Sequence, residues 1–358
     1  MTRWTDHNDT ERMVMLQQTA DAEGLPEYAV EKDWWVTMVL KAMFQTSVAE
    51  WLEFKGGTSL SKGWRLIDRF SEDIDLALSY RFFTEKLENN NQLKMLRKRC
   101  RGFVVGTLAD ELREQMLALG LKEFEVIPEV VDEAGNMIST DADPTVIYVN
   151  YRSVANAHSG YMPSRVKMEV SCLSMDEPFE VKEFGTMISG VFPDDDEDAM
   201  VAIPTVLPSR TFLEKAFLLC EEFQKPQPRS LRMSRHLYDL ERLMDTEFGK
   251  AALEDDELYG KIVEHRRKFY HVGYADYDKD YRERISFLPP ESCIEAWRAD
   301  YGELLMHFVY GNKLSFDELL ERVRELNRRF NGGAHQAEAS EGNGGRKAEV
   351  FGEQTLRS

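Results

Sequence analysis

Alternation between apolar and polar residues gives the clearest structural signal in this chain. Three stretches have the two-residue period of half-buried strands: Lys122–Glu129, Pro144–Tyr151 and Arg165–Leu173. In a fourth stretch, Ile74, Leu76 and Leu78 fall on one face. Asp73 and Asp75 therefore share the other face, because successive side chains of a strand point to opposite sides. These patterns predict strands of one partly buried sheet.

Apolar residues with helical spacing cover much of the remaining chain. Tyr28–Phe44 places aromatic and aliphatic side chains on one face, and Leu87–Leu121 predicts two amphipathic helices. From Ser209 onward an apolar stripe opens a helical second half, which continues through residues 250–325. With 358 residues and 42% hydrophobic content, the chain can form two domains and a sizeable core.

Both ends of the chain are polar. Residues 1–24 predict a poorly packed arm or a short helix, and the Gly-rich residues 331–358 predict a disordered tail. The N-terminus lacks the apolar stretch of a signal peptide, and no apolar run approaches the ~18 residues of a membrane-spanning helix. We therefore expect a soluble, cytoplasmic protein that makes no membrane contact.

The four cysteines are widely scattered and contain no CxxC pair, at Cys100, Cys172, Cys220 and Cys293. This distribution indicates reduced thiols in a cytosol, not a disulfide framework or a zinc site.

The formal net charge of −19 argues against a generic nucleic-acid binder, because phosphate contacts need lysine and arginine. A local basic patch is still present in Gln92–Arg101, which contains five cationic residues. We interpret it as a solvated helix face slightly in preference to an RNA contact. The acidic loop Pro193–Asp198 predicts a solvated, mobile segment more strongly than a metal site, although a cationic partner could dock there.

The chemistry concentrates in Phe54–Leu78. Gly56 and Gly57 let a backbone approach a polyphosphate closely, and Thr58 and Ser59 add short hydroxyl donors. A helix from Ser59 to about residue 69 would present its N-terminal amides to an anion. Neither a Walker A pattern nor a dinucleotide fingerprint is present.

Asp73 and Asp75 follow about fifteen residues later. Two neighbouring carboxylates repel each other unless a cation lies between them. Mg²⁺ bound by one or two carboxylates and by substrate phosphates is the usual arrangement in phosphoryl and nucleotidyl transfer. Either motif alone is usually a simple turn or strand end. Together, in this order, they predict a phosphate cradle followed by a metal-holding strand.

The stretches Gly56–Ser59 and Arg69–Leu76 resemble motif I of the AbiEii/AbiGii-type nucleotidyltransferase toxins, which belong to the DNA polymerase β-like superfamily. The resemblance covers roughly residues 25–245. It extends to Glu31–Trp35, to Arg210–Lys215 and to the Arg-His-x-x-Asp stretch that begins at Arg235. Within Glu31–Trp35 we expect Lys32 to be solvated, although it could reach a substrate phosphate.

The resemblance assigns three further residues to the site. Glu169 would be the third carboxylate, on a strand beside Asp73 and Asp75, where it could help to hold the metal or accept a proton. A Lys167–Glu169 surface pair is an equally good interpretation. Lys215 would contact the triphosphate as a mobile point charge.

Asp239 would complete the site by orienting Lys215 or the substrate. An ordinary i,i+4 ion pair between Arg235 and Asp239 is the alternative.

The resemblance implies an α+β fold: a polymerase β-like core, with a small mixed sheet flanked by helices, and a C-terminal helical domain. We expect residues 1–200 to form the core with its N-terminal helices. Residues 201–330 would form the helical domain that contributes Lys215 and Asp239.

The implied function is that of a toxin from a bacterial toxin–antitoxin or abortive-infection (phage defence) system. It would move NMP from an NTP to a hydroxyl, with Mg²⁺ as cofactor, tRNA 3′ ends as acceptor and an antitoxin as partner. Two alternatives remain: modification of a protein or small-molecule hydroxyl, and a non-catalytic nucleotide-binding module.

Overall fold

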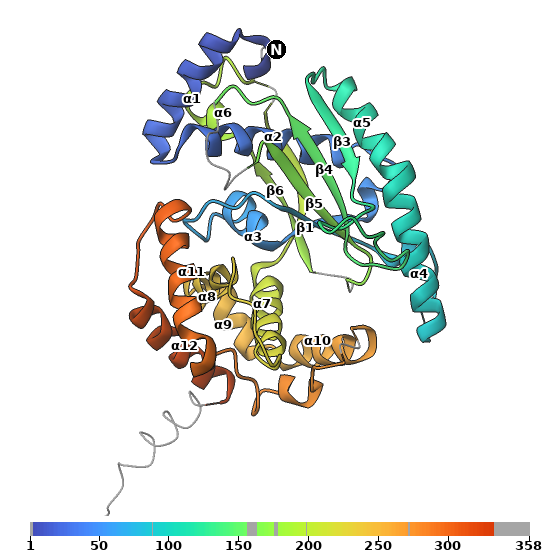
Figure 1. Cartoon of the computed structure of the whole chain (residues 1–358), viewed down its shortest axis with the longest axis vertical. Coiled ribbons are helices and arrows are strands. Elements are labelled where there is room, and N and C mark those ends of the chain that lie inside the picture. Colours follow the sequence, from blue (N-terminus) through green and yellow to red (C-terminus); the bar gives the residue numbers. More distant parts are fainter. Residues whose placement is uncertain are drawn as a thin grey trace, which may run out of the picture.

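The computed structural model describes residues 3–87, 89–155, 163–174, 178–197, 199–270 and 273–332. Within these ranges a sheet-containing half is followed by a helical half (Figure 1). None of the described helices is both long enough and apolar enough to cross a membrane. Of the predicted disordered tail, residues 333–358 lie outside the described part of the chain.

The described residues form one mixed, seven-stranded sheet in the order β3-β4-β5-β2-β1-β7-β6. The strands are β1 Leu52–Lys55, β2 Ile74–Leu78, β3 Phe124–Pro128, β4 Thr145–Tyr151, β5 Arg165–Ser171, β6 Phe179–Phe184 and β7 Val201–Val206. The pairs β1–β7 and β2–β5 are parallel, and the other neighbours are antiparallel. All four stretches predicted as strands are strands, and the predicted α+β class is confirmed.

Helices cover the sheet and build the second half of the molecule (Figure 1). They are α1 Asp9–Glu23, α2 Glu27–Met43, α3 Gly56–Thr58, α4 Asn90–Phe103, α5 Ala109–Ala118, α6 Met187–Val191, α7 Pro208–Glu222, α8 Ser234–Leu243, α9 Glu247–Glu254, α10 Asp256–Phe269, α11 Ile294–His307 and α12 Phe316–Phe330. Two π-helical turns follow α3 and α4, over Ser59–Gly63 and Val104–Leu108.

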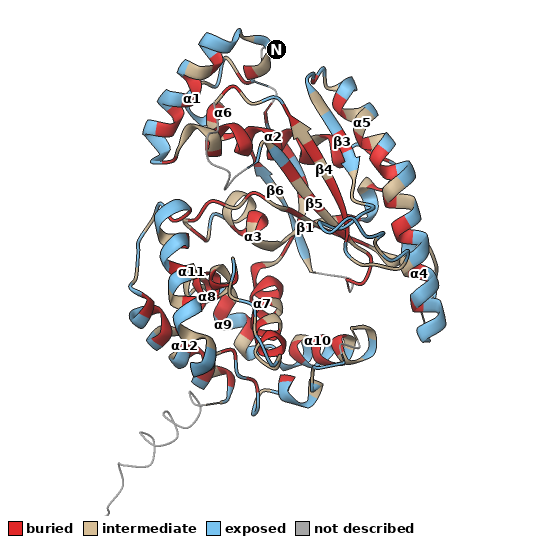
Figure 2. Cartoon of the chain, viewed as in Figure 1, coloured by how far each residue is buried: buried red, intermediate tan, exposed pale blue. Residues whose placement is uncertain are grey.

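Helix α2 is buried on nearly all sides, and it packs against β5 and β7 as well as against α1, α5 and α6. Figure 2 shows buried residues concentrated in α2, in the central strands and in α7. A helix that is enclosed in this way must satisfy each charge that it carries. Glu31 accepts hydrogen bonds from the Val154 amide at 2.8 Å and from the Ser153 hydroxyl, and Asp33 pairs with Lys62.

Lys32 of α2 is 3% exposed and forms a buried ion pair with Glu72. Glu72 also accepts from Arg232 of the helical half at 2.6 Å. Burial would raise the pKa of Glu72, but Lys32 and Arg232 outweigh it and hold the pKa below its usual range. The expectation of a solvated or phosphate-binding Lys32 is therefore wrong, because the partner that buries it lies 40 residues away in the sequence.

The N-terminal residues pack more closely than predicted. Trp4 is fully buried against Trp34, with ring centroids 5.2 Å apart, and the Arg12 guanidinium lies 4.2 Å from the Trp4 ring centre. The acidic loop is anchored at the same place. Asp196 is 1% exposed and accepts hydrogen bonds from the Trp34 indole at 3.1 Å and the Thr186 hydroxyl at 2.6 Å. Neither a loose arm nor a fully solvated acidic loop is present.

The helix predicted from Ser59 to about residue 69 ends at Gly63. Arg65 follows with a φ of 54°, in the left-handed region, so the helix cannot continue. The extended segment after it is held by the helical half: the Phe70 amide donates to the Phe308 carbonyl at 2.8 Å. Contacts distant in sequence therefore override the local helical tendency.

Strand β7 lies beyond residue 200 yet pairs with β1 and β6 in the sheet. We therefore place the boundary of the two proposed domains at Leu207, between β7 and α7, instead of at residue 200.

We expect Glu72→Ala to destabilise the protein by about 3–5 kcal/mol, because it leaves the buried Lys32 ammonium without its carboxylate. Urea unfolding followed by circular dichroism would measure this loss. Glu180→Ala, which removes an exposed partner of Lys182 on β6, is the matched control and should change the free energy of unfolding by less than about 1 kcal/mol. Equal effects of the two substitutions would contradict the importance of burial.

Candidate active site

A cavity of about 550 Å³ lies between the sheet and the helical half. The ends of β1, β2 and β5 form one wall, and α7 and α8 form the other. Among its lining residues are Lys55, Gly56, Gly57, Asp73, Asp75, Glu169, Glu214, Lys215, Arg235 and His236. The structure thus brings most of the residues predicted from sequence to one place, from segments up to about 180 residues apart.

Strand pairing places the carboxylates side by side. Asp75 on β2 is directly opposite Glu169 on the parallel strand β5, and Asp73 immediately precedes β2. Burial, followed by repulsion from Glu169 and Asp73, raises the pKa of Asp75 to about 7. The wall therefore carries more negative charge than its neighbours neutralise, which is the condition that a bound cation relieves.

The three carboxylates fit a divalent ion in part. Their oxygens do not all lie within 4.8 Å of one another: among the described residues, a different group of donors meets this limit. Mg²⁺ often takes one or two carboxylates and completes its shell with water and substrate phosphates. Asp73 and Asp75 suit such a site, with Glu169 beside them.

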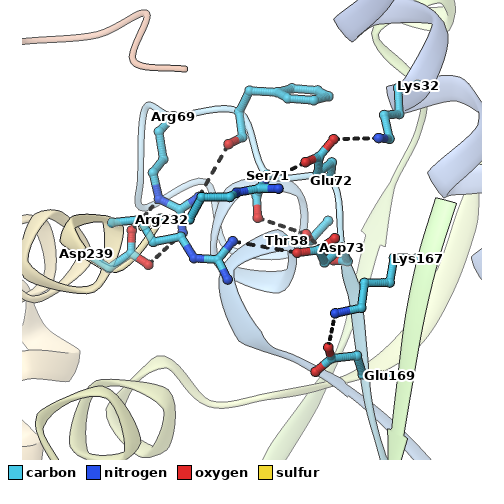
Figure 3. A network of polar contacts seen from close by, with 12 residues as sticks. Lys32, Thr58, Arg69, Ser71, Glu72, Asp73, Lys167, Glu169, Arg232 and Asp239 are labelled. Carbon is cyan, nitrogen blue, oxygen red and sulfur yellow. Dashed lines mark hydrogen bonds and ion pairs between the residues drawn. The ribbon is translucent and has the colours of Figure 1, made fainter. Parts of the chain in front are cut away.

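Two cations already touch this acidic wall. Lys167 hydrogen-bonds Glu169 on the same strand (Figure 3). Arg235 of α8 lies 3.6 Å from Asp73. Glu169 therefore pairs with Lys167 and also lies beside Asp75, so the two interpretations made from the sequence do not exclude each other. The alternative Arg235–Asp239 pair is not the observed arrangement, because Arg235 faces Asp73.

The geometry explains both glycines of the loop. Gly56 has a φ of 81°, and a Cβ added there would lie 1.9 Å from the Asp75 Oδ2. A Cβ at Gly57 would lie 2.7 Å from Arg69 Nη2 and 2.9 Å from Ser71 Oγ. The loop can approach Asp75 and Arg69 this closely only because Gly56 and Gly57 have no side chains.

Thr58 and Ser59 face the protein and not the cavity. The Thr58 hydroxyl donates to the Asp73 carbonyl and contacts Ser71 Oγ at 3.0 Å, while the Ser59 hydroxyl donates to the Gly56 carbonyl at 2.9 Å. The Ser59 amide also bonds the Gly56 carbonyl. The amides of Gly57 and Thr58 lie in the first turn, where a helix leaves N–H groups without intrahelical partners.

On the opposite wall, Asp239 is fully buried and bridges two cations. It accepts from Arg69 Nε and Nη2 at 2.7 Å each (Figure 3). The Lys215 ammonium lies 2.8 Å away from the same carboxylate. Burial would raise the pKa of Asp239, but Arg69 and Lys215 hold it far below its usual range. Arg69 and Lys215 line the cavity, whereas Asp239 lies behind them. Asp239 is thus placed to position both cations.

Sequence reasoning did not assign several charged groups of the cavity. Arg69 lies within the quoted motif but was given no role. Lys55 directly precedes the glycine pair and contacts Glu214 at 3.4 Å. Burial would raise the pKa of Glu214, yet Lys55 and Arg210 lower it to about 2. His236 also lines the cavity, as a neutral imidazole, since burial and then Lys215 and Arg235 lower its pKa well below normal.

Two comparisons with known proteins find related chains. The family model described as nucleotidyl transferase AbiEii toxin, type IV toxin–antitoxin system, matches residues 39–322. MenT4, a nucleotidyltransferase toxin from Mycobacterium tuberculosis H37Rv, has a similar structure, with a TM-score of 0.51 and 16% sequence identity over 89% of each chain. At this identity the likeness establishes the fold. A search of curated proteins finds no match.

We expect Asp75→Asn to stabilise the metal-free protein at neutral pH. The folded-state pKa of Asp75, about 7, lies above the ~3.9 of an unfolded chain, so the native state loses stability as pH rises from about 4 to about 7. The full shift would correspond to ~4 kcal/mol, and solvent in the cavity reduces our expectation to ~2 kcal/mol. Unfolding in chelator at several pH values would measure the difference.

The exposed carboxylate of Asp110 on α5 provides the control. Asp110→Asn should leave the pH dependence of the free energy of unfolding as it is in the parent chain. If the free energy of unfolding of Asp75→Asn changed with pH as steeply as that of the parent chain, the result would argue against repulsion among the carboxylates of the acidic wall.

Proposed function

The chain belongs to the AbiEii family of nucleotidyl transferase toxins of type IV toxin–antitoxin systems, and from this we propose that it transfers NMP from an NTP to the 3′ end of tRNA with Mg²⁺ as cofactor. As a nucleotidyltransferase toxin it takes an NTP as substrate and is paired with an antitoxin. The observation that carries the proposal is the single cavity in which the acidic wall of β2 and β5 faces Lys215 of α7.

In the proposed site, Asp73 and Asp75 hold the metal, and Glu169 stands beside them. A divalent ion bound there supplies positive charge that binds the triphosphate and stabilises the negative charge developing on it. Burial and its acidic neighbours raise the pKa of Asp75 to about 7. A bound cation would relieve this repulsion, which supports the assignment.

Lys215 contacts the phosphates, and Asp239 fixes the Lys215 ammonium at the cavity wall. Arg69, clamped by the same carboxylate, adds a second cation that sequence reasoning did not assign. The amide of Gly57, which lines the cavity, supplies a hydrogen-bond donor, as a close glycine approach allows. Because these donors are fixed before substrate binds, they cost little reorganisation during the reaction.

The acceptor hydroxyl attacks the α-phosphorus of the NTP. The bond from the acceptor oxygen to phosphorus forms, and the bond between the α-phosphorus and the bridging oxygen of the β-phosphate breaks, so that pyrophosphate leaves. In this scheme Glu169 accepts the proton of the acceptor hydroxyl. The Glu169 carboxylate must then contact both that hydroxyl and its present partner, Lys167.

The cavity also supports a nucleic-acid acceptor. Arg97 of α4 lines it, and the Arg97 Nε is buried without a hydrogen-bond partner. Lys94, Lys98 and Arg99 lie exposed on the same helix. Arg101 differs, because it is buried and donates to the Glu129 carbonyl at 2.9 Å. Despite the overall negative charge, α4 therefore contributes one arginine to the cavity wall and three exposed cationic side chains next to it in sequence. This local positive charge favours a polyanionic acceptor over a small molecule.

Incubating the purified protein with each α-labelled NTP, Mg²⁺ and total tRNA should place label at the RNA 3′ end. Asp75→Ala should reduce transfer by more than the ~10–100-fold that loss of a supporting metal contact costs. Label on protein or on a small molecule would favour the alternative acceptors. NTP binding without any transfer would identify a non-catalytic module and defeat the proposal.

Gly56→Ala should abolish transfer, because its Cβ would occupy the position of the Asp75 carboxylate. Gly24→Ala is a matched control: Gly24 has a similar φ of 67°, with no atom within 4 Å of an added Cβ. Both substitutions should cost ~1 kcal/mol or more of stability through backbone strain, which thermal unfolding measures. Pyrophosphate release should fall at least about 100-fold in the first variant only. Equal activity in the two variants would show that the close approach has no catalytic role.

A further inference from the structure

A second group of side chains that could hold a metal ion lies next to the same cavity, and one of its members lines the cavity wall. Cys100 of α4, Asp143 before β4 and Cys172 after β5 each offer one donor atom, and these atoms lie within 4.8 Å of one another. Both thiols are 1% exposed, and Asp143 is half-buried and lines the cavity. The three residues are separated by 43 and 29 positions in sequence, so that only the fold brings them together.

The contacts hold the donors in a fixed arrangement. Asp143 Oδ1 lies 3.5 Å from Cys172 Sγ and accepts from the Cys172 amide at 3.0 Å. Asp143 Oδ2 accepts from the Ser171 hydroxyl at 2.7 Å. A hydrogen bond with the Cys100 thiol, together with burial and Asp143, raises the pKa of the Cys172 thiol. No cation among the described contacts neutralises Asp143.

The type and spacing of these donors suit zinc. Zn²⁺ binds thiolate sulfur at about 2.3 Å and carboxylate oxygen at about 2.0–2.2 Å in a tetrahedron, whose sulfur–oxygen edge is then roughly 3.5 Å. The distance between Cys172 Sγ and Asp143 Oδ1 matches this edge. Sulfur ligands select zinc over magnesium, which prefers oxygen. This group is therefore chemically distinct from the Asp73–Asp75 site.

We propose that Cys100, Asp143 and Cys172 bind one Zn²⁺, with a water molecule from the cavity as the fourth ligand. Two sulfur–zinc bonds and one oxygen–zinc bond form, and each thiol releases its proton to solvent. No electron is transferred and no oxidant is needed.

The bound ion would tie α4 to the end of β5 and to the turn before β4. Arg97 lies one helical turn before Cys100 and lines the cavity, so the ion would fix the basic side of the wall. In this proposal the zinc holds the three segments together and takes no part in the transfer reaction.

The full-length chain, purified without a histidine tag and under reducing conditions, should be incubated with zinc, desalted and analysed by elemental mass spectrometry. We expect about one zinc ion per chain, and at least tenfold less in Cys100→Ser and Cys172→Ser. Cys220→Ser, which removes a buried thiol outside the group, is the matched control and should retain the metal. Replacing zinc by Co²⁺ should produce the near-ultraviolet charge-transfer absorption of thiolate-bound cobalt.

Asp143→Asn keeps the shape of the side chain and should weaken zinc binding while the protein stays folded. Zinc should raise the melting temperature of the parent chain in a concentration-dependent manner. The proposal fails if the reduced parent chain takes up no zinc, or if both cysteine variants retain as much as Cys220→Ser. It also fails if peroxide joins Cys100 to Cys172 while the reduced chain leaves zinc unbound, since the pair would then be a redox pair.

Discussion

One buried carboxylate links the two halves of the molecule at the cavity. Asp239 on α8 is fully buried, and it binds Arg69 from the sheet-containing half and Lys215 from α7. A buried acid surrounded by apolar groups would be strongly destabilising without these partners, and loss of one member of such a pair typically costs about 3–5 kcal/mol. Since Arg69 and Lys215 both line the cavity, this link between the halves also sets the positions of two cations in the cavity wall.

The two walls of the cavity differ in their balance of charge, although each carries both acidic and basic side chains. The β2–β5 wall has too little positive charge for its carboxylates, as the raised pKa of Asp75 indicates. The α7–α8 wall carries Lys215 and Arg235, and the neighbouring His236 stays neutral. A metal-bound triphosphate carries positive charge on its metal side and negative charge on its phosphates. The electrostatic pattern of the cavity is therefore complementary to that ligand.

Local sequence patterns predicted the features that depend on local rules. Strand alternation correctly placed Asp73 and Asp75 beside apolar strand residues and identified the strand of Glu169. Resemblance to a known family selected Lys215 and Asp239, whose roles remain proposals, and the structure adds that they touch each other.

Features set by distant partners could not be predicted in this way. Lys32 and Asp196 looked solvated because their partners, Glu72 and Trp34, lie far away in sequence. The helix after Gly57 ended early because Arg65 adopts a left-handed conformation and the next segment binds the helical half. Scattered cysteines gave no sign of the Cys100–Asp143–Cys172 group. The family match begins at residue 39, although α2 already contributes Lys32, Asp33 and Trp34 to buried pairs with Glu72, Lys62 and Asp196. A recombinant fragment cut at that border would therefore lose the α2 partners of Glu72, Lys62 and Asp196, and we expect it to be less stable than the whole chain.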